Sequence, residues 1–121
     1  MVQLFMIHAI LQIIALILFI VGIYFSKKHN LSKHHILIFT ATILMTVATG
    51  IAIYEIGGIP TIHGKIGLTA YIIILGSVYS GYLFRKGKIK RKSHKFLTLT
   101  AITLLALNII IGLYLYGAYI F

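Results

Sequence analysis

The chain has 121 residues, of which 60% are hydrophobic, and it carries a formal net charge of +10. Soluble domains use roughly 45 to 50% apolar residues, so this composition and a mean hydropathy of +1.06 exclude an ordinary water-soluble fold. The sequence contains no cysteine, which excludes disulfides, iron–sulfur clusters and covalently attached haem.

Four long apolar runs divide the sequence. They predict α-helices at about residues 4–25, 36–54, 66–84 and 96–121. An α-helix needs about 20 residues to cross a bilayer core of about 30 Å, and each run is close to that length. Because the connecting segments are short, consecutive helices should be antiparallel neighbours. We therefore expect one all-α domain over residues 1–121, an integral membrane bundle of up-down-up-down topology.

The basic residues gather in two of the three connections. Lys27, Lys28 and Lys33 lie between the first two runs, seven more lie between Arg85 and Lys95, and only Lys65 lies elsewhere. Cationic loops of membrane proteins face the cytoplasm, so both termini should lie outside the cell membrane. This distribution explains the charge by topology and by attraction to membrane lipid, without a nucleic-acid partner.

A histidine stands near the beginning of every predicted helix. The alternating topology places His8 and His63 near the outer face, and we call these two the outer layer. It places His34 and His94 near the inner face, as the inner layer. Ionisable residues in membrane segments are costly and usually functional. Two histidines on nonadjacent helices are what bis-histidine ligation of a haem iron requires, so the sequence predicts two such sites.

The inner layer leaves a choice between His34 and its neighbour His35. Shifting the sequence by 60 residues superposes His34 on His94 and Ala41 on Ala101, which favours His34. Gly50 lies closer to the helical face of His35, which favours the other residue. A second argument for His35 is that it would turn three threonines inward, as polarity favours in a membrane: Thr42, Thr46 and Thr49.

Glycines near these histidines can make room for a cofactor. Gly67 lies one turn after His63 on the same face, beside the ring that this histidine would ligate. Three further glycines follow a histidine by 14 or 18 residues and should reach the opposite layer: Gly22, Gly81 and Gly112. Small residues also serve close helix packing in any membrane bundle.

Three lysines lie near the predicted ligands. Lys33, Lys65 and Lys95 could pair with the propionates of a haem, or could extend along the helix ends toward the membrane interface. Both interpretations stay open at this point.

The segment HGKIGLTAYIIILGSVYSGYLF, residues 63–84, has the form H-x-x-x-G-L followed by a later glycine. It resembles the histidine-initiated helix of transmembrane cytochrome b561-type proteins, and the other three runs look like the remaining core helices of that family. The resemblance implies a four-helix core with two b-type haems, ligated by the first with the third helix and by the second with the fourth. It further implies electron transfer across the membrane and a possible oxidoreductase or electron-transfer subunit.

Glu55 is the only carboxylate side chain, so acid catalysis is not indicated and a quinone or a redox partner protein should exchange the electrons. The expected assembly is a homodimer or a subunit of a larger complex. The alternative function is a haem-free structural or anchor subunit of a membrane complex, in which the histidines cap and anchor helices.

Overall fold

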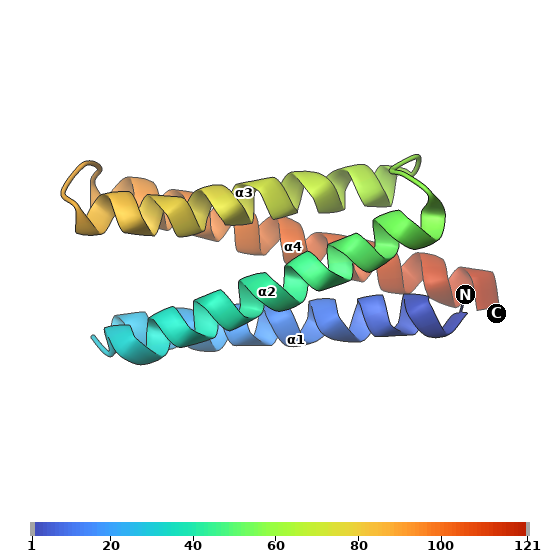
Figure 1. Ribbon diagram of the computed structural model, residues 1–121, viewed down its shortest axis with the longest axis horizontal. Helices are drawn as coiled ribbons and strands as arrows, with labels where there is room; N and C mark the ends of the chain where they lie inside the picture. The colour runs from blue at the N-terminus through green and yellow to red at the C-terminus, as the bar shows by residue number, and fades with distance from the viewer. Residues whose placement is uncertain (1, 121) are drawn as a thin grey trace.

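The chain forms four α-helices. The computed structural model describes the backbone of residues 2–120 and the side chains of residues 3–118. Its helices are α1 (Val2–Lys27), α2 (Leu31–Ile56), α3 (Ile62–Arg85) and α4 (Arg91–Ile120). They run alternately up and down, and the α1–α2 and α3–α4 turns lie at the same end of the bundle (Figure 1). The expected all-α four-helix bundle is confirmed.

The last three helices begin earlier than hydropathy predicts. The apolar runs start at residues 36, 66 and 96, four or five residues after the observed starts at 31, 62 and 91. Side-chain caps explain two of these starts. The Lys33 N–H donates to Asn30 Oδ1 at 3.1 Å, and the Gly64 N–H donates to Thr61 Oγ1 at 2.9 Å. Caps satisfy the free N–H groups of a polar first turn, which hydropathy does not detect.

Glycine makes the turns after α2 and α3 possible. Gly57 has a φ of 78°, and its N–H donates to the Ile53 carbonyl at 2.9 Å. Gly87 has a φ of 73°, and its N–H donates to the Phe84 carbonyl at 3.0 Å. Glycine adopts this left-handed conformation more readily than any other residue, so the chain can reverse within a few residues.

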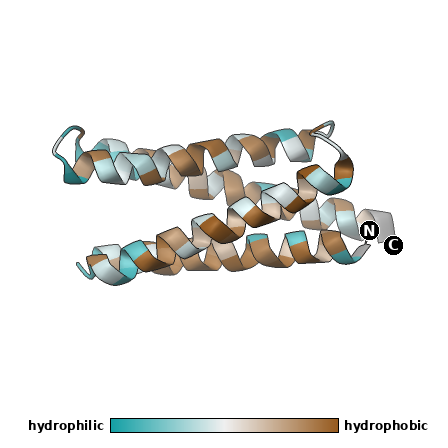
Figure 2. Cartoon of the chain, viewed as in Figure 1, coloured by the Kyte–Doolittle hydropathy of each residue, from teal (hydrophilic) through white to brown (hydrophobic). Residues whose placement is uncertain are grey.

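All four helices are long and apolar enough to cross a membrane. Their outward faces carry large apolar side chains, among them Ile17, Ile43, Ile72 and Ile110, which are 53%, 64%, 58% and 62% exposed. Apolar segments follow the helix bodies, and polar segments gather at the end with the α1–α2 and α3–α4 turns (Figure 2). Lipid accommodates such an exterior and water does not. The chain is a multi-pass membrane protein by length and composition.

The core is built from one pattern that all four helices share. In every helix, an alanine stands seven residues after the histidine and a large apolar residue stands eleven residues after it. The residue fourteen positions after the histidine is small or carries an amide. Every one of these seventh and eleventh residues is at most 3% exposed. The four sets are His8, Ala15, Phe19 and Gly22; His34, Ala41, Met45 and Ala48; His63, Ala70, Ile74 and Ser77; and His94, Ala101, Leu105 and Asn108. The histidines therefore lie on the faces that the helices bury.

The bundle consists of two helical hairpins. α1 packs closely on α2, and α3 packs closely on α4. The two hairpins meet more sparsely, through α1 with α4 and α2 with α3 (Figure 1). α1 and α3 therefore face each other diagonally, as do α2 and α4. The two outer-layer histidines lie on the diagonal pair α1 and α3, and the two inner-layer histidines lie on the diagonal pair α2 and α4.

Candidate metal centre

The rings of the two outer-layer histidines lie close together across the bundle. The ring centroids of His8 and His63 are 6.4 Å apart, and the ring planes are at 89°. An imidazole nitrogen binds a transition metal at about 2 Å and lies about 1 Å from its ring centroid, so two rings on opposite sides of one ion have centroids about 6 Å apart. The observed separation fits that requirement.

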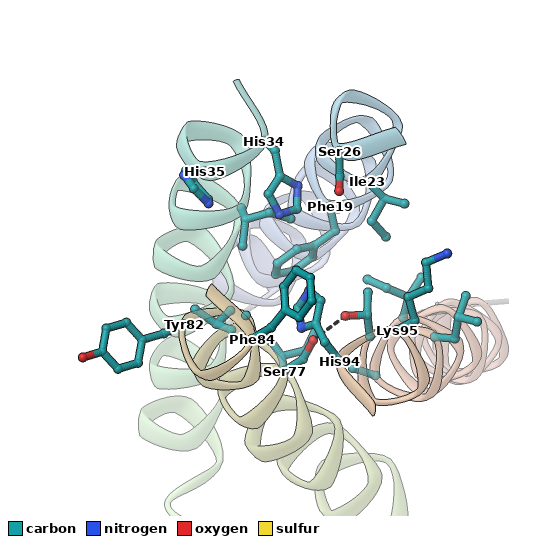
Figure 3. A pocket seen from close by; sticks show the side chains of 18 of the residues that line it. Phe19, Ile23, Ser26, His34, His35, Ser77, Tyr82, Phe84, His94 and Lys95 are labelled. Atoms are coloured by element: carbon teal, nitrogen blue, oxygen red, sulfur yellow. Dashed lines mark hydrogen bonds between the residues drawn. The ribbon is translucent and has the colours of Figure 1, made fainter. Parts of the chain in front are cut away.

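The two histidines of the inner layer line one cavity. This cavity measures about 390 Å³ and lies between the hairpins, at the end with the two basic turns. His34 enters its lining from α2 and His94 from α4 (Figure 3). Phe19, Ile74 and Ala101 form part of its apolar wall. The volume lies within the range of small-molecule sites, and the lining is mostly apolar with a few polar groups, as is usual for such sites.

Backbone carbonyls fix the protonation of one histidine in each layer. His8 Nδ1 lies 2.8 Å from the Ala48 carbonyl oxygen, and His34 Nδ1 lies 2.8 Å from the Gly22 carbonyl oxygen. A carbonyl only accepts, so each Nδ1 must donate a proton. In the neutral ring the lone pair is then on Nε2, which is free to bind a metal. Histidines that ligate metals are usually oriented by such a hydrogen bond from the second ring nitrogen.

A serine side chain holds His94 in the same tautomer. Ser80 Oγ donates to the Ser77 carbonyl oxygen at 2.6 Å, which uses the only proton of this hydroxyl. The Ser80 oxygen must therefore accept a hydrogen bond from the His94 Nδ1–H, which lies 2.7 Å away. The Phe84 ring stacks nearly parallel to the His94 ring, at a centroid distance of 6.4 Å and an angle of 5°. His94 is thus held with Nδ1 protonated and with the Nε2 lone pair free.

His63 differs from the other three. Its Nδ1 is buried and has no hydrogen-bond partner among the described residues. Its ring packs closely against α4, because a Cβ at Gly112 would lie only 2.7 Å from the His63 Cε1 atom. The position of this ring is therefore fixed by packing, while its hydrogen bond is incomplete.

The rotation of α2 turns the face of His34 into the core. Ala41 and Ala48, on that face, are fully buried. Thr46, on the face of His35, is exposed and donates to the carbonyl oxygen of Thr42. His35 also lines the inner cavity, and its ring centroid lies 5.4 Å from that of His34. The structure thus favours the rotation predicted by the internal repeat over the one predicted from threonine polarity.

The glycines predicted to reach the opposite layer do so. Gly112 faces His63, and a Cβ at Gly81 would lie 3.1 Å from the His94 Cε1 atom. Gly22 supplies the carbonyl oxygen that binds His34. The place of Gly67 beside a haem stays a prediction, and a Cβ there would lie 2.7 Å from Asn108 Nδ2. Gly67 therefore makes room for the Asn108 side chain.

The three candidate lysines are placed differently from one another. Lys95 lines the inner cavity. The Lys33 ammonium lies 5.0 Å from the centroid of the Phe25 ring, on a different surface, and Lys33 does not line the cavity. Lys65 is exposed near the start of α3, at the opposite end of the bundle. Three basic residues that sequence reasoning missed also line the inner cavity: Lys27, Arg85 and Arg91.

No group of three or more histidine, aspartate, glutamate or cysteine side chains gathers within the described part of the chain. Comparison with family models, curated proteins and solved structures found no significant match to this chain.

Proposed function

We propose that this protein transfers electrons across a membrane as a small cytochrome b, holding two haem b groups between paired histidines. The observation that carries the proposal is the arrangement of the outer layer. The ring centroids of His8 and His63 lie at the separation that one iron between them requires. His8 is also held by the Ala48 carbonyl in the tautomer that ligates through Nε2.

The residues of the inner layer fit a haem by their chemistry. His34 and His94 carry free Nε2 lone pairs and line one cavity with an apolar wall. Four basic residues that line this cavity suit the negative propionates: Lys27, Arg85, Arg91 and Lys95. The two layers are well separated, because Ala48 binds His8 and lies fourteen residues along α2 from His34, about 21 Å at 1.5 Å per residue.

When bound, haem supplies a reversible one-electron couple, and the protein supplies its ligands and environment. The four histidines would fix the position of the two sites and would bind iron as neutral imidazoles. The buried alanines and the large apolar side chains after them separate the layers with a low-dielectric core. Low dielectric and axial ligation are two of the factors by which a protein sets a haem potential.

The charge distribution supports one orientation in the cell membrane. Ten of the eleven lysines and arginines lie at the end with the α1–α2 and α3–α4 turns. By the positive-inside rule this end faces the cytoplasm, and both termini face outward. The inner layer then exchanges electrons on the cytoplasmic side and the outer layer on the other side. A membrane quinone or a redox partner protein is the proposed source or acceptor.

An optical spectrum tests the proposal directly. Protein purified from cells with abundant haem should show sharp reduced-minus-oxidised bands of b type, with about two haems per chain. The haem content of a pyridine extract checks the stoichiometry. A colourless but folded protein would contradict the proposal and would favour a haem-free structural subunit.

The pairing within the outer layer gives a second expected result. His8→Ala and His63→Ala should each lose the same single haem and keep the inner one, because each removes one of two ligands to the same iron. Haem content and the remaining spectrum measure this. His29→Asn is the control, since His29 is exposed in the α1–α2 turn with a φ of 59°, which asparagine tolerates, and belongs to neither layer. Loss of different haems from the two variants would disprove the pairing.

A further inference from the structure

The strongest unexplained feature is a buried amide in the middle of α4. Asn108 is 8% exposed, and its Oδ1 has no hydrogen-bond partner among the described residues. Buried polar groups are normally paired, and an unpaired amide in a membrane is costly. Asn108 occupies the fourteenth position after His94, where α1 and α2 have Gly22 and Ala48. Packing alone does not call for an amide at this position.

Two close contacts place Asn108 beside His63. Gly67, one turn after His63, makes room for the Asn108 side chain. A Cβ on Gly67 would lie only 2.7 Å from Asn108 Nδ2. Gly112, one turn after Asn108, makes room in the same way for the His63 ring. The His63 ring and the Asn108 side chain each pack against the other's helix, one turn away from the other residue. Two glycines thus bring the two polar side chains together.

The two unpaired atoms are complementary. Nδ1 of each of the other three layer histidines has a hydrogen-bond partner, whereas His63 Nδ1 has none among the described residues. Asn108 Oδ1 is an acceptor without a donor. We propose that Asn108 is the positioning residue of His63, whose Nδ1–H donates to Asn108 Oδ1 while its Nε2 lone pair is presented toward His8.

The inference rests on the proposed function for its effect on the outer haem, but not for the hydrogen bond itself. A side-chain acceptor differs from the backbone carbonyl that holds His8, since its strength can be changed by one substitution. A hydrogen bond from Nδ1–H makes the imidazole a stronger ligand and favours the ferric state. Weakening it should therefore raise the potential of the outer haem alone.

The first experiment needs no haem. Nitrogen-15 NMR of labelled histidine in the haem-free protein, in lipid bilayers, reports the tautomer of each ring. The His63 signals, assigned by their loss in His63→Ala, should indicate the Nδ1–H form in the wild type. They should shift toward the Nε2–H form in Asn108→Leu, with the His8 signals unchanged. Identical His63 signals in both proteins would overturn the inference.

The second experiment uses the haem-loaded protein and a redox titration. Asn108→Leu should raise the midpoint potential of the outer haem and weaken its retention by about 10- to 100-fold. Asn108→Asp, a stronger acceptor, should lower that potential, which a purely structural role would not predict. Retention of the inner haem shows that each variant folds. If the leucine variant does not fold, Asn108→Ser tests the same shift with a weaker acceptor.

The matched control is Ser77→Ala, because Ser77 is the buried fourteenth residue after His63 and is level with the inner layer. It should leave the outer potential unchanged. If every Asn108 variant retains two haems and the outer potential does not shift, the role of Asn108 is contradicted and the proposed function is not. A wild type that binds no haem would contradict the proposed function, and the NMR result would then decide the hydrogen bond.

Discussion

His34→Ala should abolish the inner haem, while His35→Ala should leave its spectrum nearly intact. His34 lies on the face of α2 that the core buries, and its Nδ1 is bound to the Gly22 carbonyl, so Nε2 is free to act as a ligand. His35 also lines the cavity, but the face that continues from it carries the exposed Thr46. Haem content and the low-temperature spectrum of each purified variant measure the difference.

His35→Ala is the internal control of this pair, since it removes an equal imidazole from the same cavity. A lost inner haem in His35→Ala, together with a retained one in His34→Ala, would reverse the assignment. It would mean that α2 turns by about one residue, roughly 100°, when the site is filled. The outer haem should survive both substitutions, because its ligands lie at the other end of the bundle.

Gly112→Ala should empty the outer site although it changes no ligand. The added Cβ would lie 2.7 Å from Cε1 and 3.2 Å from Nε2 of His63, so the ring must move away. A displaced His63 ring no longer lies at the distance from the His8 ring that one iron needs. We expect the occupancy of the outer haem to fall at least about tenfold, as when the support of a metal ligand is lost. Haem content per chain measures it.

Gly117→Ala is the matched control on the same helix, since no atom of the described residues lies within 4 Å of a Cβ at that position. It should retain both haems. Gly81→Ala should have a weaker effect, confined to the inner haem, because its Cβ would lie 3.1 Å from His94. Full outer occupancy in Gly112→Ala would show that the His63 ring has another position from which to bind.

Much of this architecture could be predicted from the sequence. Apolar runs and basic loops gave the four helices and their alternation, because crossing a membrane requires both length and hydropathy. The internal repeat predicted the rotation of α2 through Ala41 and Ala48, and burial of these residues agrees with it. Aligning all four helices on their histidines, rather than in two pairs, would also have found the shared alanine seven residues later.

The partners of the histidines could not be predicted. The acceptor for His8 is the Ala48 carbonyl, and every residue has a carbonyl, so no side chain marks it. Ser80 was detectable only as a polar residue in an apolar helix, and its role depends on the hydrogen bond that it donates to Ser77. Lys27, Arg85 and Arg91 line the inner cavity because helix ends from both hairpins meet there, which spacing along the chain does not show.

The sparse packing between the hairpins has a consequence for how the protein assembles. Each layer takes one histidine from each hairpin, so neither hairpin alone provides a complete site. Helices that insert independently must still associate within lipid, where no hydrophobic force drives them together. A ligand that binds only the associated form stabilises it in proportion to the logarithm of its free concentration. Haem binding would then stabilise the association of two separately inserted hairpins. The yield of folded protein in the cell would follow the haem supply.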